Sequence, residues 1–239
     1  MFGLDDSIAG FSDGTTLLVV MVVAIVLGLR HASDPDHLAA VTTLIASGKE
    51  RVARRAGMLG LVWGLGHATS LFTFGIPIVL YRAYLPERVQ QGAESLVGLV
   101  IVALAVWLLV RWRRGIFDLH RHGDGEPRHA HGPAHPLKPR TRLQAYAIGL
   151  IHGLGGTAGV GILLLSSIPG HGLAIAALGV FALFTAISMA IVSGAFGLTL
   201  SVASVQGSFA RLAPVLGTAS LLFGIWYALG AQGLVPYYF

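Results

Sequence analysis

The chain has 239 residues, of which 54% are hydrophobic and only 11% charged, and its mean hydropathy is +0.74. Because soluble domains carry about 25% charged residues, this composition excludes an ordinary soluble domain and indicates an all-α integral membrane protein. The net charge of +5 does not indicate a nucleic-acid partner, because the basic residues lie in short links between apolar segments. The absence of cysteine excludes disulfide bonds and thiolate metal sites.

Six apolar segments are long enough, or nearly long enough, to cross a bilayer, which takes about 20 residues per helix. We place these transmembrane helices at about 15–46, 57–80, 92–112, 144–167, 172–200 and 212–232. The chain as a whole, residues 1–239, is therefore predicted to form a single transmembrane domain.

The basic residues predict how this domain is oriented. Of the 16 Lys and Arg, 13 lie in or beside the links that follow the first, third and fifth spans. Positively charged links stay in the cytoplasm. This rule predicts a multi-pass protein of the cell (inner) membrane with three cytoplasmic links and both termini outside.

The first apolar segment is interrupted by His31, Asp34, Asp36 and His37, with Pro35 among them. Each ionisable group at membrane depth costs about 2.5 kcal/mol or more, so such groups are rare unless they are paired, solvated or functional. Imidazole and carboxylate are also the ligands of divalent first-row metals. Since proline suits the first turn of a helix and disrupts a helix interior, we expect the span to break here and a half-helix to start near Pro35.

If the local geometry stays near-helical, His31, Asp34 and His37 form one stripe and Asp36 points to roughly the opposite side. Asp34 is then the better metal ligand of the two carboxylates. The aspartates are alternatively partners that orient the histidines. A further alternative is a salt-bridge cluster of Arg30, Asp34 and Asp36 that only braces the fold.

Two later histidines also lie inside predicted spans. His67, in the second span, is flanked by small residues that let helices approach closely, and it is the best additional metal ligand. A hydrogen bond across helices is its alternative role. His152 precedes a glycine-rich run in the fourth span, where metal binding and simple packing are equally open.

Three other polar residues lie within the spans. Glu94, at the start of the third span, either attracts cations or relays protons, or is an ordinary interfacial carboxylate. Thr185 and Ser188, in the fifth span, either line a pathway or bond their own helix backbone.

The link at 113–143 is predicted to be a flexible, histidine-rich cytoplasmic loop between two three-helix halves. It holds five of the ten histidines together with Gly, Pro and charged residues. Such tracts are typical of weak, multivalent metal binding, and a plain solvated linker is the alternative.

An inverted 3+3 repeat is one organisation that the sequence allows, because three spans per half reverse the direction of the second half. The sequence Gly28-Leu29-Arg30-His31 recurs as Gly149-Leu150-Ile151-His152, and Trp107 and Trp226 lie late in the third and sixth spans. Chance matches in Gly- and Leu-rich sequence are the alternative.

The run from Leu29 to Val41, with His31 followed after four residues by Asp36-His37, resembles the signature of the nickel/cobalt transporter family, the high-affinity nickel permeases. The segment Leu65-Gly66-His67-Ala68-Thr69 resembles the second motif of that family. The segment from Gly149 to Gly156 is more similar to the short nickel permease-like or urease-accessory membrane proteins. The resemblance implies a permease in which His31, Asp34, Asp36, His37 and His67 match positions used for selectivity and transport.

We therefore expect transport of Ni²⁺ or Co²⁺, most simply uptake, with the metal as substrate and without a cofactor or an enzymatic activity. The expected metal-binding residues are His31, Asp34, Asp36, His37, His67 and His152. Efflux is an alternative, and so is a membrane accessory protein that hands metal to a cytoplasmic metallochaperone or to maturation factors of nickel enzymes. A di-iron oxidase would need more clustered His and Glu, and direct ATP driving would need a phosphate-binding loop that the chain lacks.

Overall fold

The computed structural model describes residues 4–46, 53–81, 86–115, 141–153, 155, 168 and 170–236, which form helices and contain no strand. In chain order the helices are α1 (Leu4–His31), α2 (Pro35–Ala46), α3 (Ala53–Tyr81), α4 (Glu87–Arg113), α5 (Arg142–His152), α7 (His171–Ser201) and α8 (Ala203–Ala231). An all-helical fold suits these apolar sequences, because a helix satisfies its own backbone hydrogen bonds in lipid.

The described helices include four that are long and apolar enough to cross a membrane, and the bent pair α1 and α2 brings the number to five. The pair bends by 47° at residues 32–34, which confirms the predicted interruption of the first span. Of the predicted fourth span, 144–167, only α5 and residues 153 and 155 are described, so the total of six spans and the inverted repeat stay predictions.

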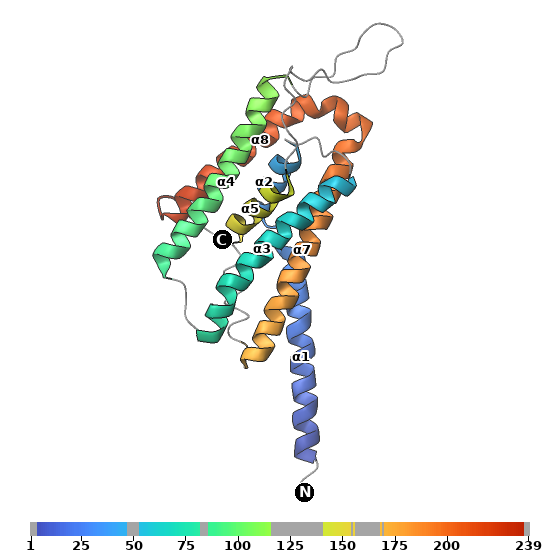
Figure 1. Ribbon diagram of the computed structural model, residues 1–239, viewed down its shortest axis with the longest axis vertical. Helices are drawn as coiled ribbons and strands as arrows, with labels where there is room; N and C mark the ends of the chain where they lie inside the picture. Colours follow the sequence, from blue (N-terminus) through green and yellow to red (C-terminus); the bar gives the residue numbers. More distant parts are fainter. Residues whose placement is uncertain are drawn as a thin grey trace.

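The helices pack in two main pairs, α3 with α7 and α4 with α8. Helix α1 lies against α7, α5 lies against α3, and α2 reaches α4 and α8 (Figure 1). In Figure 1, α3 begins and α4 ends at the upper end of the molecule, whereas the N-terminus lies at the lower end. The short half-helices α2 and α5 thus lie against the long spans.

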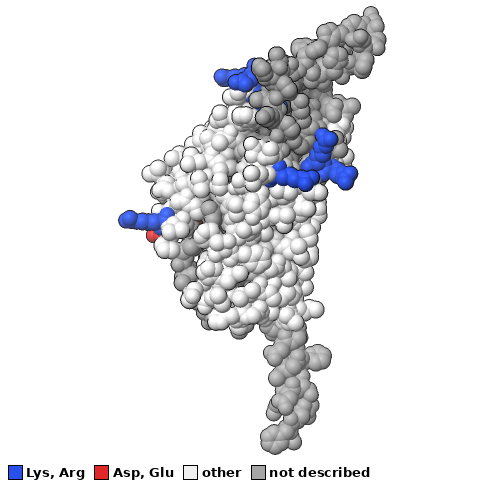
Figure 2. All heavy atoms as spheres, in the orientation of Figure 1, with Lys and Arg blue, Asp and Glu red and all other residues white. Residues whose placement is uncertain are grey.

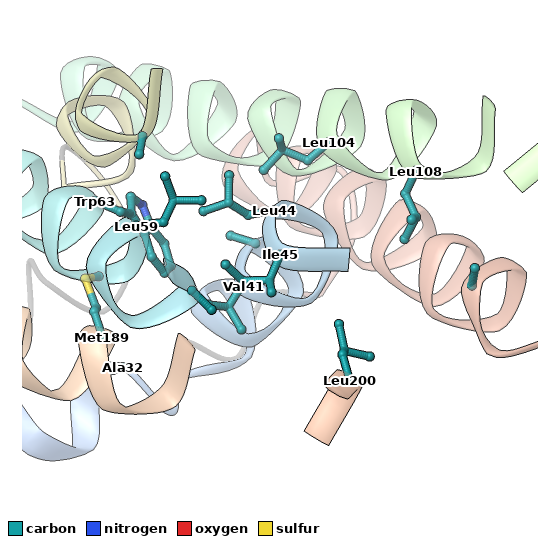
Figure 3. Packing of buried hydrophobic residues seen from close by; sticks show 14 of the residues in the cluster. Ala32, Val41, Leu44, Ile45, Leu59, Trp63, Leu104, Leu108, Met189 and Leu200 are labelled. Atoms are coloured by element: carbon teal, nitrogen blue, oxygen red, sulfur yellow. The ribbon is translucent and has the colours of Figure 1, made fainter. Parts of the chain in front are cut away.

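A buried apolar cluster holds α2 in this position. Val41, Leu44 and Ile45 of α2 are almost inaccessible to solvent and face Leu59 and Trp63 of α3 (Figure 3). Because α2 is anchored by these side chains, the polar residues at its start are held at a fixed depth in the bundle.

The outer surface is apolar around the bundle. Exposed leucines on four helices include Leu18, Leu99, Leu198 and Leu222. On the face shown in Figure 2, most of the coloured Lys and Arg lie in the upper half, toward the end where α3 begins and α4 ends. This apolar belt with charge toward one end is the surface expected of a multi-pass membrane protein. The loop predicted at 113–143 runs between the end of α4 and the start of α5, and residues 116–140 lie outside the described residues.

Candidate metal site

The break between α1 and α2 is a tight turn that presents the first histidines. The N–H of Ser33 donates to the carbonyl of Arg30, and the N–H of Asp34 donates to the carbonyl of His31. Helix α2 then starts at Pro35, and the carbonyl of Asp34 accepts its first hydrogen bond from Leu38. The α1 hydrogen-bond ladder therefore ends where the motif begins, which lets its side chains turn inward.

Four histidines from four helices gather beside this break. They are His31 at the end of α1, His37 on α2, His67 on α3 and His152 at the end of α5. The ring of His37 lies 4.5 Å from that of His31, 5.2 Å from that of His67 and 4.5 Å from that of His152. All four side chains are at most 4% exposed. His37 is thus the centre of a buried imidazole cluster.

His31 and His67 form the closest pair of rings by their nitrogens. Their Nε2 atoms lie 3.0 Å apart, at hydrogen-bond distance, and His31 Nδ1 lies 3.2 Å from Asp34 Oδ2. With metal–nitrogen bonds of about 2.1 Å, two ligands at a right angle on one ion are also about 3 Å apart. The pair therefore has the spacing of two adjacent ligands of a metal, with a carboxylate behind one of them.

Asp36 bridges the other two histidines. Its Oδ1 accepts a hydrogen bond from His37 Nδ1 at 3.1 Å, and its Oδ2 lies 3.3 Å from His152 Nε2. Asp36 was expected to point away from the stripe only if the local geometry stayed near-helical, and this condition does not hold because the chain turns at residues 32–34. Asp36 is 3% exposed and is an integral member of the cluster.

These contacts fix which nitrogens are available as ligands. Since Nδ1 of His37 donates to Asp36, its Nε2 keeps a lone pair, and that atom is buried without a hydrogen-bond partner among the described residues. Nδ1 of His67 and Nδ1 of His152 are also buried and unpartnered there. Carboxylates behind metal-binding histidines fix the ring orientation and raise its basicity in the same way. Buried polar atoms normally have partners, so these orphaned nitrogens indicate a site built for a ligand.

Two overlapping groups have the geometry of metal sites. One nitrogen from each of His31, His37 and His67 lies within 4.8 Å of the other two, and ligand atoms of Asp36, His37 and His152 meet the same criterion. His37 belongs to both groups. The six sequence-predicted residues are therefore brought together, with Asp34 and Asp36 supporting the imidazoles.

Two aromatic rings, which the sequence analysis did not single out, enclose the cluster. Trp63 of α3 lies 5.6 Å from the His37 ring and 5.5 Å from the His152 ring, and Phe181 of α7 lies 5.5 Å from the His31 ring. These aromatic rings form part of the surroundings of the imidazoles. No sequence signal distinguishes them from ordinary packing aromatics in an apolar span.

The remaining candidates have separate positions. Glu94 is buried on α4 and accepts a hydrogen bond from Gln90 at 3.0 Å. Thr185 bonds the carbonyl of Phe181 on its own helix, as the alternative reading expected, whereas Ser188 donates to the carbonyl of Leu29 on α1. The histidines of the loop at 113–143 lie outside the described residues.

The bracing alternative for Arg30 does not fit the geometry. Its guanidinium lies 3.7 Å from Asp34 and is 72% exposed, while Asp36 contacts His37 and His152. An exposed cation at this distance contributes little to stability. The two carboxylates therefore contact the histidines more closely than they contact Arg30.

The comparisons agree with this donor set. Residues 17–219 match the family model described as high-affinity nickel-transport protein. The chain belongs to the high-affinity nickel transport family. A family of transporters accounts for a buried imidazole and carboxylate cluster in apolar spans, and the nickel transport family is not a family of enzymes.

Several curated proteins are similar to this chain. The urease accessory protein UreH of Bacillus sp. (strain TB-90) is 29% identical over 157 residues, which cover 65% of this chain and 66% of that protein. The high-affinity nickel transport protein of Cupriavidus necator is 36% identical over 99 residues, or 41% of this chain and 27% of that protein. The nickel/cobalt efflux system RcnA of Salmonella arizonae is 28% identical over 93 residues, or 38% of this chain and 33% of that protein.

The chain thus spans two thirds or less of the length of each of these relatives. No solved structure matches it. The chain belongs to the nickel transport family, and its relatives differ in the direction and role that their names state.

Proposed function

We propose that this chain carries Ni²⁺ or Co²⁺ into the cell through the site at His31, Asp34, Asp36, His37, His67 and His152. The observation that carries the proposal is the buried four-histidine cluster centred on His37. Imidazole and carboxylate suit both metals, and the two buried carboxylates offset the charge of one divalent ion. A site of this kind binds tightly, which suits capture of a dilute ion from outside.

The direction is tested by following metal in cells that lack their own nickel transporters. Uptake predicts that expression raises accumulation of radiolabelled nickel and increases sensitivity to nickel in the medium. Efflux predicts lower accumulation and greater resistance. Unchanged accumulation and resistance, with the protein present in the membrane, would contradict transport in either direction.

The overlap of the two ligand groups supports transport in which the metal ion occupies the two groups one after the other. An ion held by His31, His37 and His67 needs to change only part of its coordination to reach Asp36 and His152, because His37 is common to both groups. A stepwise exchange of ligands avoids leaving the ion unsolvated inside the membrane, where an unpaired charge is very costly. We propose that the ion crosses the midplane by this exchange.

The His152→Ala variant separates the two positions. We expect purified His152→Ala protein to retain tight binding of nickel at the group formed with His67, while uptake in cells falls to background. Isothermal titration calorimetry and the uptake assay measure the two properties on one preparation. Full uptake by this variant would show that the second position is not used.

Orientation belongs to the same proposal. We propose that both termini lie outside and the histidine-rich loop lies in the cytoplasm. The start of α3 and the end of α4, which lie at the end of the bundle opposite the N-terminus (Figure 1), support this orientation. Cysteine accessibility tests it, because the chain has no cysteine of its own. A single cysteine introduced in 116–140 should react only after the membrane is permeabilised.

A second function, hand-over of nickel to a cytoplasmic metallochaperone, is favoured by the similarity to the urease accessory protein. Deletion of residues 118–136 discriminates between them. A permease should retain much of its nickel uptake without this segment, whereas a docking protein should lose activation of the nickel enzyme. Nickel uptake and urease activity measured in the same cells give the two readouts.

A further inference from the structure

Two buried serines hold the backbone immediately before two site histidines. Ser188 of α7 donates to the carbonyl of Leu29 at 2.7 Å, two residues before His31. Ser70 of α3 donates to the carbonyl of Leu150 at 2.6 Å, two residues before His152. In each case the serine comes from a different helix than the histidine whose backbone it holds.

The glycines next to these carbonyls make matching contacts. A Cβ at Gly28 would lie 2.6 Å from the carbonyl oxygen of Phe181 and 3.1 Å from the nitrogen of Thr185. A Cβ at Gly149 would collide with the carbonyl oxygen of Trp63 and lie 3.0 Å from the nitrogen of His67. Each glycine therefore lets a half-helix touch the backbone of a long span.

The aromatic contacts match as well. Phe181 lies 5.5 Å from the ring of His31, and Trp63 lies 5.5 Å from the ring of His152. Each α1 residue named here and its α5 counterpart are the same number of residues apart in the sequence. The same holds for each α3 residue and its α7 counterpart. The contact of α1 with α7 is thus repeated by α5 with α3, with Ser188 corresponding to Ser70 and Thr185 to His67.

We propose that Ser70 and Ser188 are matched positioning residues, each of which fixes the end of the histidine-bearing helix of the opposite half of an inverted repeat. This inference rests on the proposed function, because it assigns the serines to the metal site through His152 and His31. The symmetry is incomplete at the ligands, since Thr185 stands where the first half has His67 and Gly155 stands where it has Asp34.

The serines matter because carbonyls at a helix end have no partner within the helix. The N–H of Ser33 bonds the carbonyl of Arg30, so Leu29 receives its hydrogen bond from Ser188 across the helix pair. Without the hydroxyl, a carbonyl at a partly buried helix contact loses its partner in an apolar environment, and its segment is free to shift. A shift of His31 would disturb its 3.0 Å approach to His67.

The first test is a comparison of alanine and threonine variants. We expect Ser188→Ala to raise the KM for nickel uptake about 10-fold, as loss of groups that orient metal ligands does, with the maximal rate per folded protein unchanged. Ser188→Thr keeps a hydroxyl and should restore the KM. The matched control is Ser193→Ala, because Ser193 is buried on the same helix and its hydroxyl has no partner among the described residues.

An equal change in Ser188→Ala and Ser193→Ala, or a change that follows only the amount of folded protein, would overturn the positioning role. So would failure of threonine to restore the KM. Absence of nickel binding and uptake by the unaltered protein would instead overturn the proposed function. The two failures are therefore distinguishable in one set of measurements.

The second test asks which histidine each serine acts through. In purified His152→Ala protein, nickel binds at His31, His37 and His67 alone, so adding Ser70→Ala should leave its dissociation constant unchanged. Adding Ser188→Ala should weaken binding about 10-fold. Non-additive effects identify residues that act together, and equal effects of the two serines in this background would refute the assigned pairs.

Discussion

Replacing His37 with alanine is expected to reduce nickel uptake to the background of cells without the protein. His37 belongs to both ligand groups and its ring lies within 5.2 Å of the other three site histidines. Loss of a residue that merely supports a ligand costs about 10–100-fold in metal affinity, so loss of the shared ligand should reach at least the upper end of that range. Uptake of radiolabelled nickel and titration of purified protein measure both effects.

His171→Ala is the matched control for this variant. His171 is exposed at the start of α7, where the same replacement removes an imidazole without touching the cluster. We expect its uptake and affinity to equal those of the unaltered protein. If His37→Ala bound nickel as tightly as His171→Ala, the central role assigned to His37 would be wrong.

Much of the site was predictable because membrane burial makes ionisable residues conspicuous. His31, His37, His67 and His152 stand out in apolar sequence, and the structure brings these four together. Proline chemistry also predicted the break before α2, which the bend at Pro35 confirms.

The contact of Asp36 with His152 could not be predicted, although Asp36 was expected at the site, because it depends on how far the chain turns between α1 and α2. A helical wheel assigns positions only along one continuous helix, and a turn of three residues changes the direction of every later side chain. The bend brings Asp36 between His37 and His152, a contact across more than a hundred residues of sequence.

The interhelical hydrogen bonds of Ser70 and Ser188 could not be predicted from the sequence for a different reason. Serine within an apolar helix usually bonds its own backbone, and Thr185 does so here. Only the packing of α1 on α7 and of α5 on α3 shows that the two serine hydroxyls reach another helix. The tertiary contacts, and not the residue type, give them a role beside the site.

The close crossing of α3 and α5 predicts the largest effect on stability. A Cβ at Gly149 would collide with the carbonyl oxygen of Trp63, which belongs to a helix backbone that has little room to move. Overpacking of a buried contact costs about 1–3 kcal/mol and occasionally more. We expect Gly149→Ala to lie at or above the upper value, which lowers the Tm of a chain of this size by about 6–12 °C. The displacement also moves His152, so nickel binding should weaken in the protein that still folds.

The control for Gly149→Ala is Gly92→Ala, because a Cβ at Gly92 of α4 would meet no atom within 4 Å. Alanine in a helix is favoured over glycine by about 0.5–1 kcal/mol, so Gly92→Ala should keep or slightly raise the Tm in detergent. The same substitution is thus expected to change stability in opposite directions at the two positions. A Tm of Gly149→Ala equal to that of Gly92→Ala would mean that α5 does not lie against the backbone of α3. His152 would then lose the contact that brings it to His37.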